Sequence, residues 1–189
     1  MNIIVSPYGK ESFYCRPDST LIRALDEYYI PDQVEKISVV PVMYIKTLRA
    51  GKAIANRFAQ RYIDSYGFGL LIHPTLKGEY FTGQQERAFI ENSLDYTSVI
   101  PLLSFPEMEI PAANTHKFEV QINYRNPFDK FIFPSYDGIM ERISLISRYC
   151  SLRIGDFITM ELAKPVEITP VSRLTGSVDG EQIFNFVVK

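Results

Sequence analysis

The sequence predicts a mostly β fold of the α+β class, with two main helices, and three observations support this. The 189 residues include 13 Phe and 12 Tyr, and aromatic residues favour strands. Twelve prolines indicate frequent turns. Hydrophobic residues make up 46% of the chain and charged residues 22%, which is typical of a globular protein rather than a disordered one. A chain of this length can bury roughly 70% of its unfolded surface, so we expect a single domain over residues 1–189.

Apolar, β-branched runs predict strands in the first half of the chain. Residues 2–5 form the first expected strand, and residues 36–46 form a longer one. Pro41 lies inside the longer run and has no N–H, so we expect a sheet edge or a bulge at that point. Residues 68–72 form a third, short apolar strand that ends at His73.

Two segments show helical periodicity. Gly51 is expected to open the first helix, because Ile54, Phe58 and Tyr62 recur at spacings of four residues, and Gly67 is expected to end it. Asp137 is expected to cap the second helix, whose apolar stripe consists of Ile139, Ile143, Ile146 and Cys150.

The second half contains further strands. Residues 117–124 alternate between polar and apolar side chains, which indicates a half-buried antiparallel strand. Residues 157–162 and 183–188 are also expected to be strands, with a hairpin turn at 178–181 before the last one. Residues 101–111 contain three prolines and are expected to form an extended connector.

The charge balance and the absence of targeting features exclude several functional classes. The formal charge is −2, and the basic residues Arg49, Lys52, Arg57 and Arg61 form only a weak cluster, so we expect no nucleic-acid partner. No apolar run is long enough to span a membrane, and the first residues do not resemble a signal peptide. We therefore expect a cytoplasmic protein that does not bind membranes.

The histidines and cysteines do not form a recognisable catalytic motif. His73 and His116 lack carboxylates at metal-ligand spacing and are interpreted as structural or solvent-facing. Cys150 lies on the apolar helix stripe and is interpreted as a core residue. Arg16 could lower the pKa of Cys15, but a thiol without a nearby base is a weak candidate nucleophile.

One carboxylate pair and one glycine pair also favour structural interpretations. Glu107 and Glu109 would share a face of the extended connector, which suits a metal site, but no other ligand lies nearby in the sequence. Gly67 and Gly69 precede a strand rather than a helix, so they do not form a phosphate-binding loop.

Four stretches in order along the chain resemble the fumarylacetoacetate hydrolase family, in its short single-domain form. Residues 13–22 resemble the family's Phe-x-Lys-Pro-Ser segment, with Arg16 in place of the lysine. Residues 48–69 resemble its strand–helix–strand passage. Residues 143–158 resemble its late helix and Leu-x-x-Gly-Asp turn, and residues 174–186 its closing hairpin.

The resemblance implies a mixed β-sandwich roll, commonly assembled as a homodimer. It also implies a chemistry that uses a divalent cation, usually magnesium, held by a Glu-x-Glu pair and an Asp. The metal polarises diketo oxygens of the substrate, and a His–Glu pair near the N-terminus activates water.

This sequence departs from the family pattern at each of these positions. The Glu-x-Glu positions correspond to Val40 and Val42, and the Asp position corresponds to Leu71. Asn92 stands in place of the catalytic lysine, and the family's Thr-Gly-Thr-Pro loop is replaced from Met160 onward. The segment between residues 5 and 16 contains no histidine, so we expect the N-terminal catalytic segment to be truncated.

Two functional hypotheses of different classes follow. In the first, the chain is a non-catalytic relative without metal or cofactor, which acts as a binding or subunit-type protein and forms a homodimer or a heteromer with a paralogue. In the alternative, it is a hydrolase or lyase acting on acylpyruvate- or oxaloacetate-like substrates, with magnesium and a relocated site built from His73, Glu91, Asp95 and Glu161. A third idea is a metal-free pocket that binds a small molecule.

Overall fold

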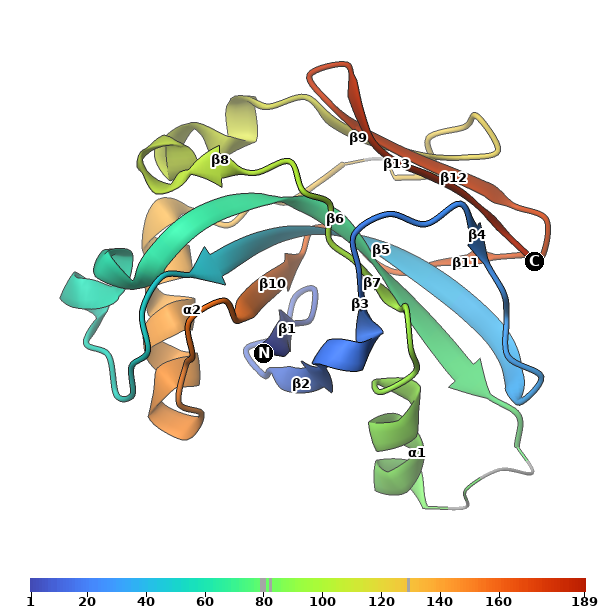
Figure 1. The fold of residues 1–189 in the computed structure, drawn as a ribbon, viewed down its shortest axis with the longest axis horizontal. Coiled ribbons are helices and arrows are strands. Elements are labelled where there is room, and N and C mark those ends of the chain that lie inside the picture. The colour runs from blue at the N-terminus through green and yellow to red at the C-terminus, as the bar shows by residue number, and fades with distance from the viewer. Residues whose placement is uncertain (79–80, 82, 129) are drawn as a thin grey trace.

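Two β-sheets form most of the protein (Figure 1). The structure is a computed structural model that describes residues 1–78, 81, 83–128 and 130–189. The strand order of the larger sheet is β2-β1-β10-β5-β6-β7-β3, with β11 also paired to β5 and β8 to β6. Its strands are β1 (Asn2–Ser6), β2 (Tyr14–Pro17), β3 (Leu21–Ile22), β5 (Val34–Thr47), β6 (Ile63–Leu76), β7 (Ser98–Val99), β8 (Phe105–Pro106), β10 (Phe157–Glu161) and β11 (Val166–Ile168).

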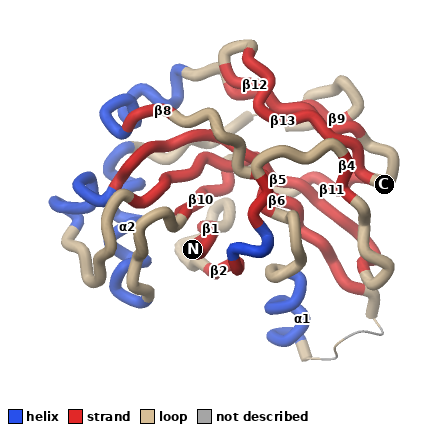
Figure 2. Tube along the Cα trace, in the orientation of Figure 1, coloured by secondary structure: helices blue, strands red, loops and turns tan. Residues whose placement is uncertain are grey.

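The smaller sheet has the strand order β4-β13-β12-β9 and lies across β5 and β6 in Figure 1. Its strands are β4 (Glu27–Tyr28), β9 (Phe118–Ile122), β12 (Arg173–Val178) and β13 (Glu181–Val188). Figure 2 shows α1 (Gln84–Glu91) and α2 (Tyr136–Tyr149) at the periphery of the two sheets. The 3-10 helices are η1 (Asp18–Thr20), η2 (Asn56–Tyr62) and η3 (Glu107–Thr115). None of the helices in the described ranges has the length and apolar character needed to cross a lipid bilayer.

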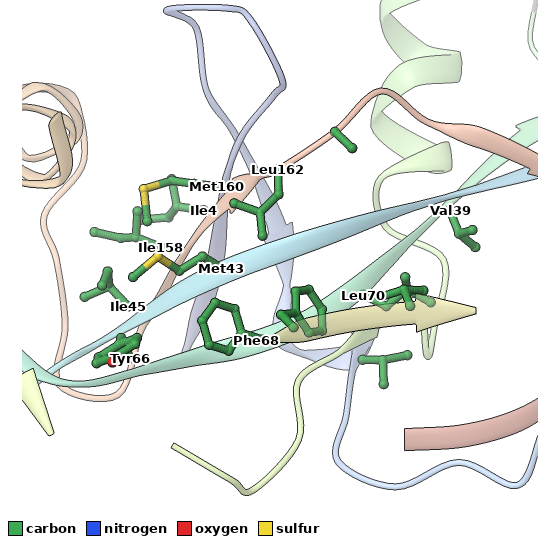
Figure 3. Packing of buried hydrophobic residues seen from close by; sticks show 14 of the residues in the cluster. Ile4, Val39, Met43, Ile45, Tyr66, Phe68, Leu70, Ile158, Met160 and Leu162 are labelled. Carbon is green, nitrogen blue, oxygen red and sulfur yellow. The ribbon is translucent and has the colours of Figure 1, made fainter. Parts of the chain in front are cut away.

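The main hydrophobic core lies between the two sheets and extends beneath α2. The ring of Phe68 on β6 stacks on the ring of Phe118 on β9, with centroids 4.9 Å apart, so aromatic packing joins the sheets directly. Figure 3 shows Ile4 of β1 and Met160 of β10 beside Met43 of β5 in the same core. The fold class expected from the sequence is therefore confirmed.

Strands β5 and β6 are buried on both faces. One face contributes to the main core, and the other contributes to a second apolar cluster that contains Val40, Val42 and Leu71. Two-sided burial explains why residues 36–46 form a continuous apolar run, whereas β9 alternates between buried and partly exposed residues. The predicted strands over residues 2–5, 36–46, 117–124, 157–162 and 183–188 are all present, with boundaries shifted by at most two residues.

Pro41 occupies neither a sheet edge nor a bulge, so that prediction is wrong. It pairs with Leu70 in the regular part of the β5–β6 ladder. The Pro41 carbonyl accepts a hydrogen bond from the N–H of Leu162, on the side of β5 that faces β10 and β11. The nitrogen of Pro41 lies on this same side of the strand. On that side the partner of β5 changes from β11 to β10, so no ladder bond requires the missing N–H.

The first predicted helix is also wrong in type and extent. Gly51 forms an isolated bridge with Leu152, the helical segment is the 3-10 helix η2, and β6 already begins at Ile63. Gly67 therefore lies inside a strand. A Cβ at this position would collide with the hydroxyl of Tyr44, so the glycine permits a close approach of that ring rather than ending a helix.

The second predicted helix is present as α2, but its ends differ from the prediction. Ser135, not Asp137, is the N-cap, and its side chain accepts a hydrogen bond from the N–H of Gly138. Cys150 is the C-cap and is only partly buried. The helix expected over residues 51–67 is replaced by η2. The structure also contains α1, which the sequence did not predict.

The predicted connector of residues 101–111 is not extended throughout. It contains β8 and then the first turns of η3, in which Glu107 and Glu109 both lie. Glu107 and Glu109 therefore do not share one face of an extended segment.

We predict that Gly69→Ala destabilises the protein by about 1–3 kcal/mol. A Cβ on Gly69 would collide with the backbone carbonyl of Val99, which cannot move without disturbing the pairing of β6 with β7. Urea unfolding measures the effect. Gly78→Ala is the matched control, because a Cβ there meets no atom of the described residues within 4 Å. Equal stability of the two variants would contradict the prediction.

Candidate functional site

The positions that the family resemblance assigns to metal ligands contain packed aliphatic side chains. Val40, Val42 and Leu71 have no solvent exposure, and Val40 is the direct cross-strand neighbour of Leu71. The other buried side chains of this cluster are Ile3 and Val5 from β1, Tyr44 from β5, Ile100 from the segment after β7, and Phe157 from β10. The side chains from β1 pack against the face of β5 and β6 that a ligand would have to reach.

These residues do not fit a hard divalent cation. Magnesium and manganese require several oxygen ligands with compensating negative charge, and aliphatic side chains supply neither. Within the part of the chain that the structure describes, no three His, Cys, Asp or Glu side chains converge into a possible metal site. We therefore derive no chemical step through a metal.

The other two positions assigned from the resemblance lie away from this cluster. Asn92 is the C-cap of α1, and its N–H donates to the carbonyls of Ala88 and Ile90. Met160 is buried in the main core on the opposite face of the larger sheet (Figure 3). The structure thus brings together three of the five assigned positions.

Of the four candidates for a relocated site, the structure brings two together. His73 Nε2 lies 2.9 Å from Glu161 Oε1, although the two chain positions are far apart. Glu91 instead accepts a hydrogen bond of 2.8 Å from the N–H of Leu76. Asp95 lines a separate cavity beyond the end of α1.

A fully buried arginine organises the His73–Glu161 pair. Arg16 on β2 has no solvent exposure, and its Nη1 donates to the carbonyls of Ile72 (3.1 Å) and Thr97 (2.9 Å). Its Nη2 lies 3.1 Å from His73 Nδ1. A guanidinium can only donate, so Nδ1 must accept and the proton of the neutral ring resides on Nε2, the nitrogen that faces Glu161. The separation of Nε2 and Glu161 Oε1 is that of an ion pair, but the two groups are not aligned for a good hydrogen bond.

Burial determines the charge state of this network. Desolvation lowers the pKa of His73, and the Arg16 charge lowers it further, whereas the Glu161 carboxylate opposes both effects. The ring is therefore neutral at pH 7 and separates a guanidinium from a carboxylate. Desolvation also raises the pKa of Tyr14, whose ring centroid lies 5.9 Å from the Arg16 guanidinium carbon.

A cavity of about 450 Å³ lies beside Glu161, between the chain after β1, the end of β10 and the first turns of α2. Glu161 Oε2 accepts a hydrogen bond of 2.8 Å from the N–H of Tyr8. Ser6 also lines this cavity, and its buried hydroxyl has no hydrogen-bond partner in the part of the chain that the structure describes. Nδ1 of His73 accepts from Arg16 and Nε2 carries the ring proton, so neither nitrogen has a free lone pair with which to accept a proton from a ligand in this arrangement.

His116 connects structural elements, as the sequence interpretation allowed. Its Nδ1 lies 2.6 Å from Asp179 Oδ2 in the β12–β13 turn, and its Nε2 lies 3.0 Å from the Tyr66 hydroxyl on β6. The hydrogen bond from His116 holds the pKa of Asp179 below its usual value. This cluster links the two sheets and leaves neither nitrogen of His116 free.

The expectation that Arg16 lowers the pKa of Cys15 is wrong, because the guanidinium points toward β6 instead. Partial desolvation of the thiol, followed by the neighbouring Cys150 thiol, raises the pKa of Cys15 to about 11. Cys15 therefore carries little thiolate at neutral pH.

Sequence reasoning missed the role of Arg16, although a signal was present. Arg16 occupies the position that the resemblance assigns to a lysine, and its cross-strand partner in β1 is the apolar Ile3. A charged residue in such surroundings must find buried partners.

No family model matches the sequence, and neither does any curated protein. Solved structures that match this whole chain include the following three. Fumarylpyruvate hydrolase from Pseudomonas aeruginosa, solved with Mn²⁺ and pyruvate, superimposes with a TM-score of 0.76 over 90% of its own chain at 14% identity. Fumarylacetoacetate hydrolase from Exiguobacterium antarcticum gives 0.76 over 74% of its chain at 16% identity. Maleylpyruvate hydrolase from Sphingobium gives 0.74 over 70% of its chain at 16% identity.

The fold is that of the fumarylacetoacetate hydrolase family. The fold that the resemblance implied is thus confirmed, and identities of 14–16% carry the likeness no further than the fold.

We predict that Arg16→Met destabilises the protein by about 3–5 kcal/mol, because it leaves the buried Glu161 carboxylate without a compensating cation. Chemical denaturation measures the change. The double variant Arg16→Met/Glu161→Gln should recover part of the loss. Arg49→Met, an exposed control, should change stability by less than about 0.5 kcal/mol. A loss below about 1 kcal/mol in Arg16→Met would show that the network contributes little.

We predict that the free energy of unfolding decreases as the pH falls from 7 to 5, and that His73 causes part of this decrease. The folded pKa of His73 lies below the unfolded value of 6.5, so in this interval the unfolded chain takes up a proton that the folded chain does not. Stability from this group is fully present above pH 6.5 and is lost below it. Denaturation across this range should give a shallower slope for His73→Gln, whereas parallel profiles would refute the assignment.

Proposed function

We propose that this protein is a non-catalytic relative of the hydrolases that share its fold, and that it acts as a binding or subunit-type protein. The observation that supports this proposal is the aliphatic cluster of Val40, Val42 and Leu71, which has no solvent exposure. Each residue stands where the resemblance assigns a carboxylate.

The packing around these positions supports loss of the site rather than substitution of one ligand. Ile3 and Val5 of β1 fill the space in front of the aliphatic side chains. A dication placed there would lose most of its hydration without gaining anionic ligands, which is strongly unfavourable. A change back to a metal site would require both new carboxylates and removal of this packing.

As a subunit, the chain would pair with itself or with an active paralogue in the cytoplasm. Both cysteines are free thiols in the structure, which agrees with a reducing compartment. Sedimentation of the purified chain, alone and with a paralogue, distinguishes the two assemblies.

The second candidate function is a hydrolase or lyase that acts on acylpyruvate- or oxaloacetate-like substrates through a relocated site. The contact between His73 and Glu161 beside a cavity favours it. The geometry supports it less well, because Nδ1 of the ring accepts from Arg16 and Nε2 carries the ring proton, so neither nitrogen can act as a base.

We predict that calorimetric titration with Mn²⁺ and Mg²⁺ shows no saturable site with a Kd below about 1 mM, and that acylpyruvates and oxaloacetate are not turned over above the background rate. A micromolar metal site would overturn the proposal. Turnover that disappears in both Glu161→Gln and His73→Gln would instead establish the second candidate. Circular dichroism of each variant controls for folding.

A further inference from the structure

A second cavity, of about 560 Å³, lies between the chain around β4 and the segment that follows α1. Three tyrosines line it, Tyr28, Tyr29 and Tyr96, together with the carboxylates of Glu27 and Asp95. Apolar side chains, among them Ile22 and Leu25, line the remainder. This cavity is separate from the His73–Glu161 network.

The charge of the lining has one sign. Among the described residues that line the cavity, two are acidic and none is a lysine or an arginine. Within the described ranges, Asp95 has no cationic side chain within 4.0 Å, whereas Glu27 contacts the ammonium of Lys189. The lining therefore disfavours an anion and attracts a cation.

The tyrosines make this cavity suitable for an organic cation rather than a bare metal ion. Carboxylate and aromatic faces together bind ammonium groups, because the ring face carries negative electrostatic potential. The chain already shows such a contact: the Lys189 ammonium lies 5.8 Å from the centroid of the Tyr29 ring. A small metal ion would instead require converging oxygen ligands, and no such group occurs in the described part of the chain.

Tyr28 is the most deeply buried of the three tyrosines. Only 3% of this residue is exposed, and its hydroxyl has no hydrogen-bond partner among the described residues. Desolvation raises the pKa of Tyr28 to about 12, so the phenol stays neutral. Tyr28 therefore contributes a neutral aromatic ring to the wall of the cavity.

We propose that this cavity binds small organic cations that carry an alkylated ammonium group. The aromatic rings contact the alkyl groups, and Asp95 supplies a carboxylate without a competing partner in the described chain. The proposal does not depend on the proposed function, because none of the residues that line this cavity belongs to the cluster of Val40, Val42 and Leu71.

Titration of the full chain with choline and tetramethylammonium tests the proposal, with heat and the NMR signals of the tyrosines as readouts. We expect saturable binding with a Kd of about 10 mM or tighter. The neutral isostere 3,3-dimethylbutan-1-ol should bind at least about five-fold more weakly, because it lacks the charge. Absence of saturation up to about 50 mM, or equal binding of the neutral isostere, overturns the proposal.

Variants locate the site. Asp95→Asn and Tyr96→Leu change exposed side chains and should preserve folding, and each should weaken choline binding by about five-fold or more. Asp137→Asn and Tyr124→Leu change an exposed aspartate and an exposed tyrosine outside the cavity and should leave binding unchanged. Equal weakening by the control variants would show that binding is non-specific and would refute the assignment.

Discussion

The buried guanidinium of Arg16 determines how the N-terminal part of the chain is held. A charge without solvent requires acceptors, and the structure supplies the carbonyls of Ile72 and Thr97 together with His73. These groups belong to β6 and to the segment before β7, so the same side chain fixes β2 against both. Glu161 supplies the compensating negative charge through a ring that remains neutral.

Two-sided burial of β5 and β6 is the second constraint, and it connects the fold to the candidate site. The face toward the smaller sheet must be apolar to form the main core. The opposite face is where the resemblance assigns carboxylates, and in this chain it is apolar as well. A continuous apolar sequence in a central strand is thus a folding requirement, and it leaves the positions that the resemblance assigns to metal ligands without charge.

Local patterns predicted strands and α2 because their periodicity reports burial directly, as the alternation of β9 illustrates. The extent of β6 could not be predicted, because Gly67 is required for the close approach of Tyr44 on the neighbouring strand, and this contact is not visible in the local sequence. The candidate site shows the same limit. His73 and Glu161 could be proposed as candidates from residue type, but their contact depends on long-range pairing, and sequence spacing does not reveal the acceptors that Arg16 finds.

The buried arginine and the aliphatic cluster are related through charge. A site built for a dication needs several carboxylates, which would repel one another in the absence of the ion. In this chain Glu161 is the cross-strand neighbour of Val42, and Arg16 compensates its negative charge across the neutral ring of His73. This network is neutral overall without an exchangeable ion. The aliphatic side chains of Val40, Val42 and Leu71 are electrostatically consistent with it, since three carboxylates there would add uncompensated negative charge in a region that excludes water.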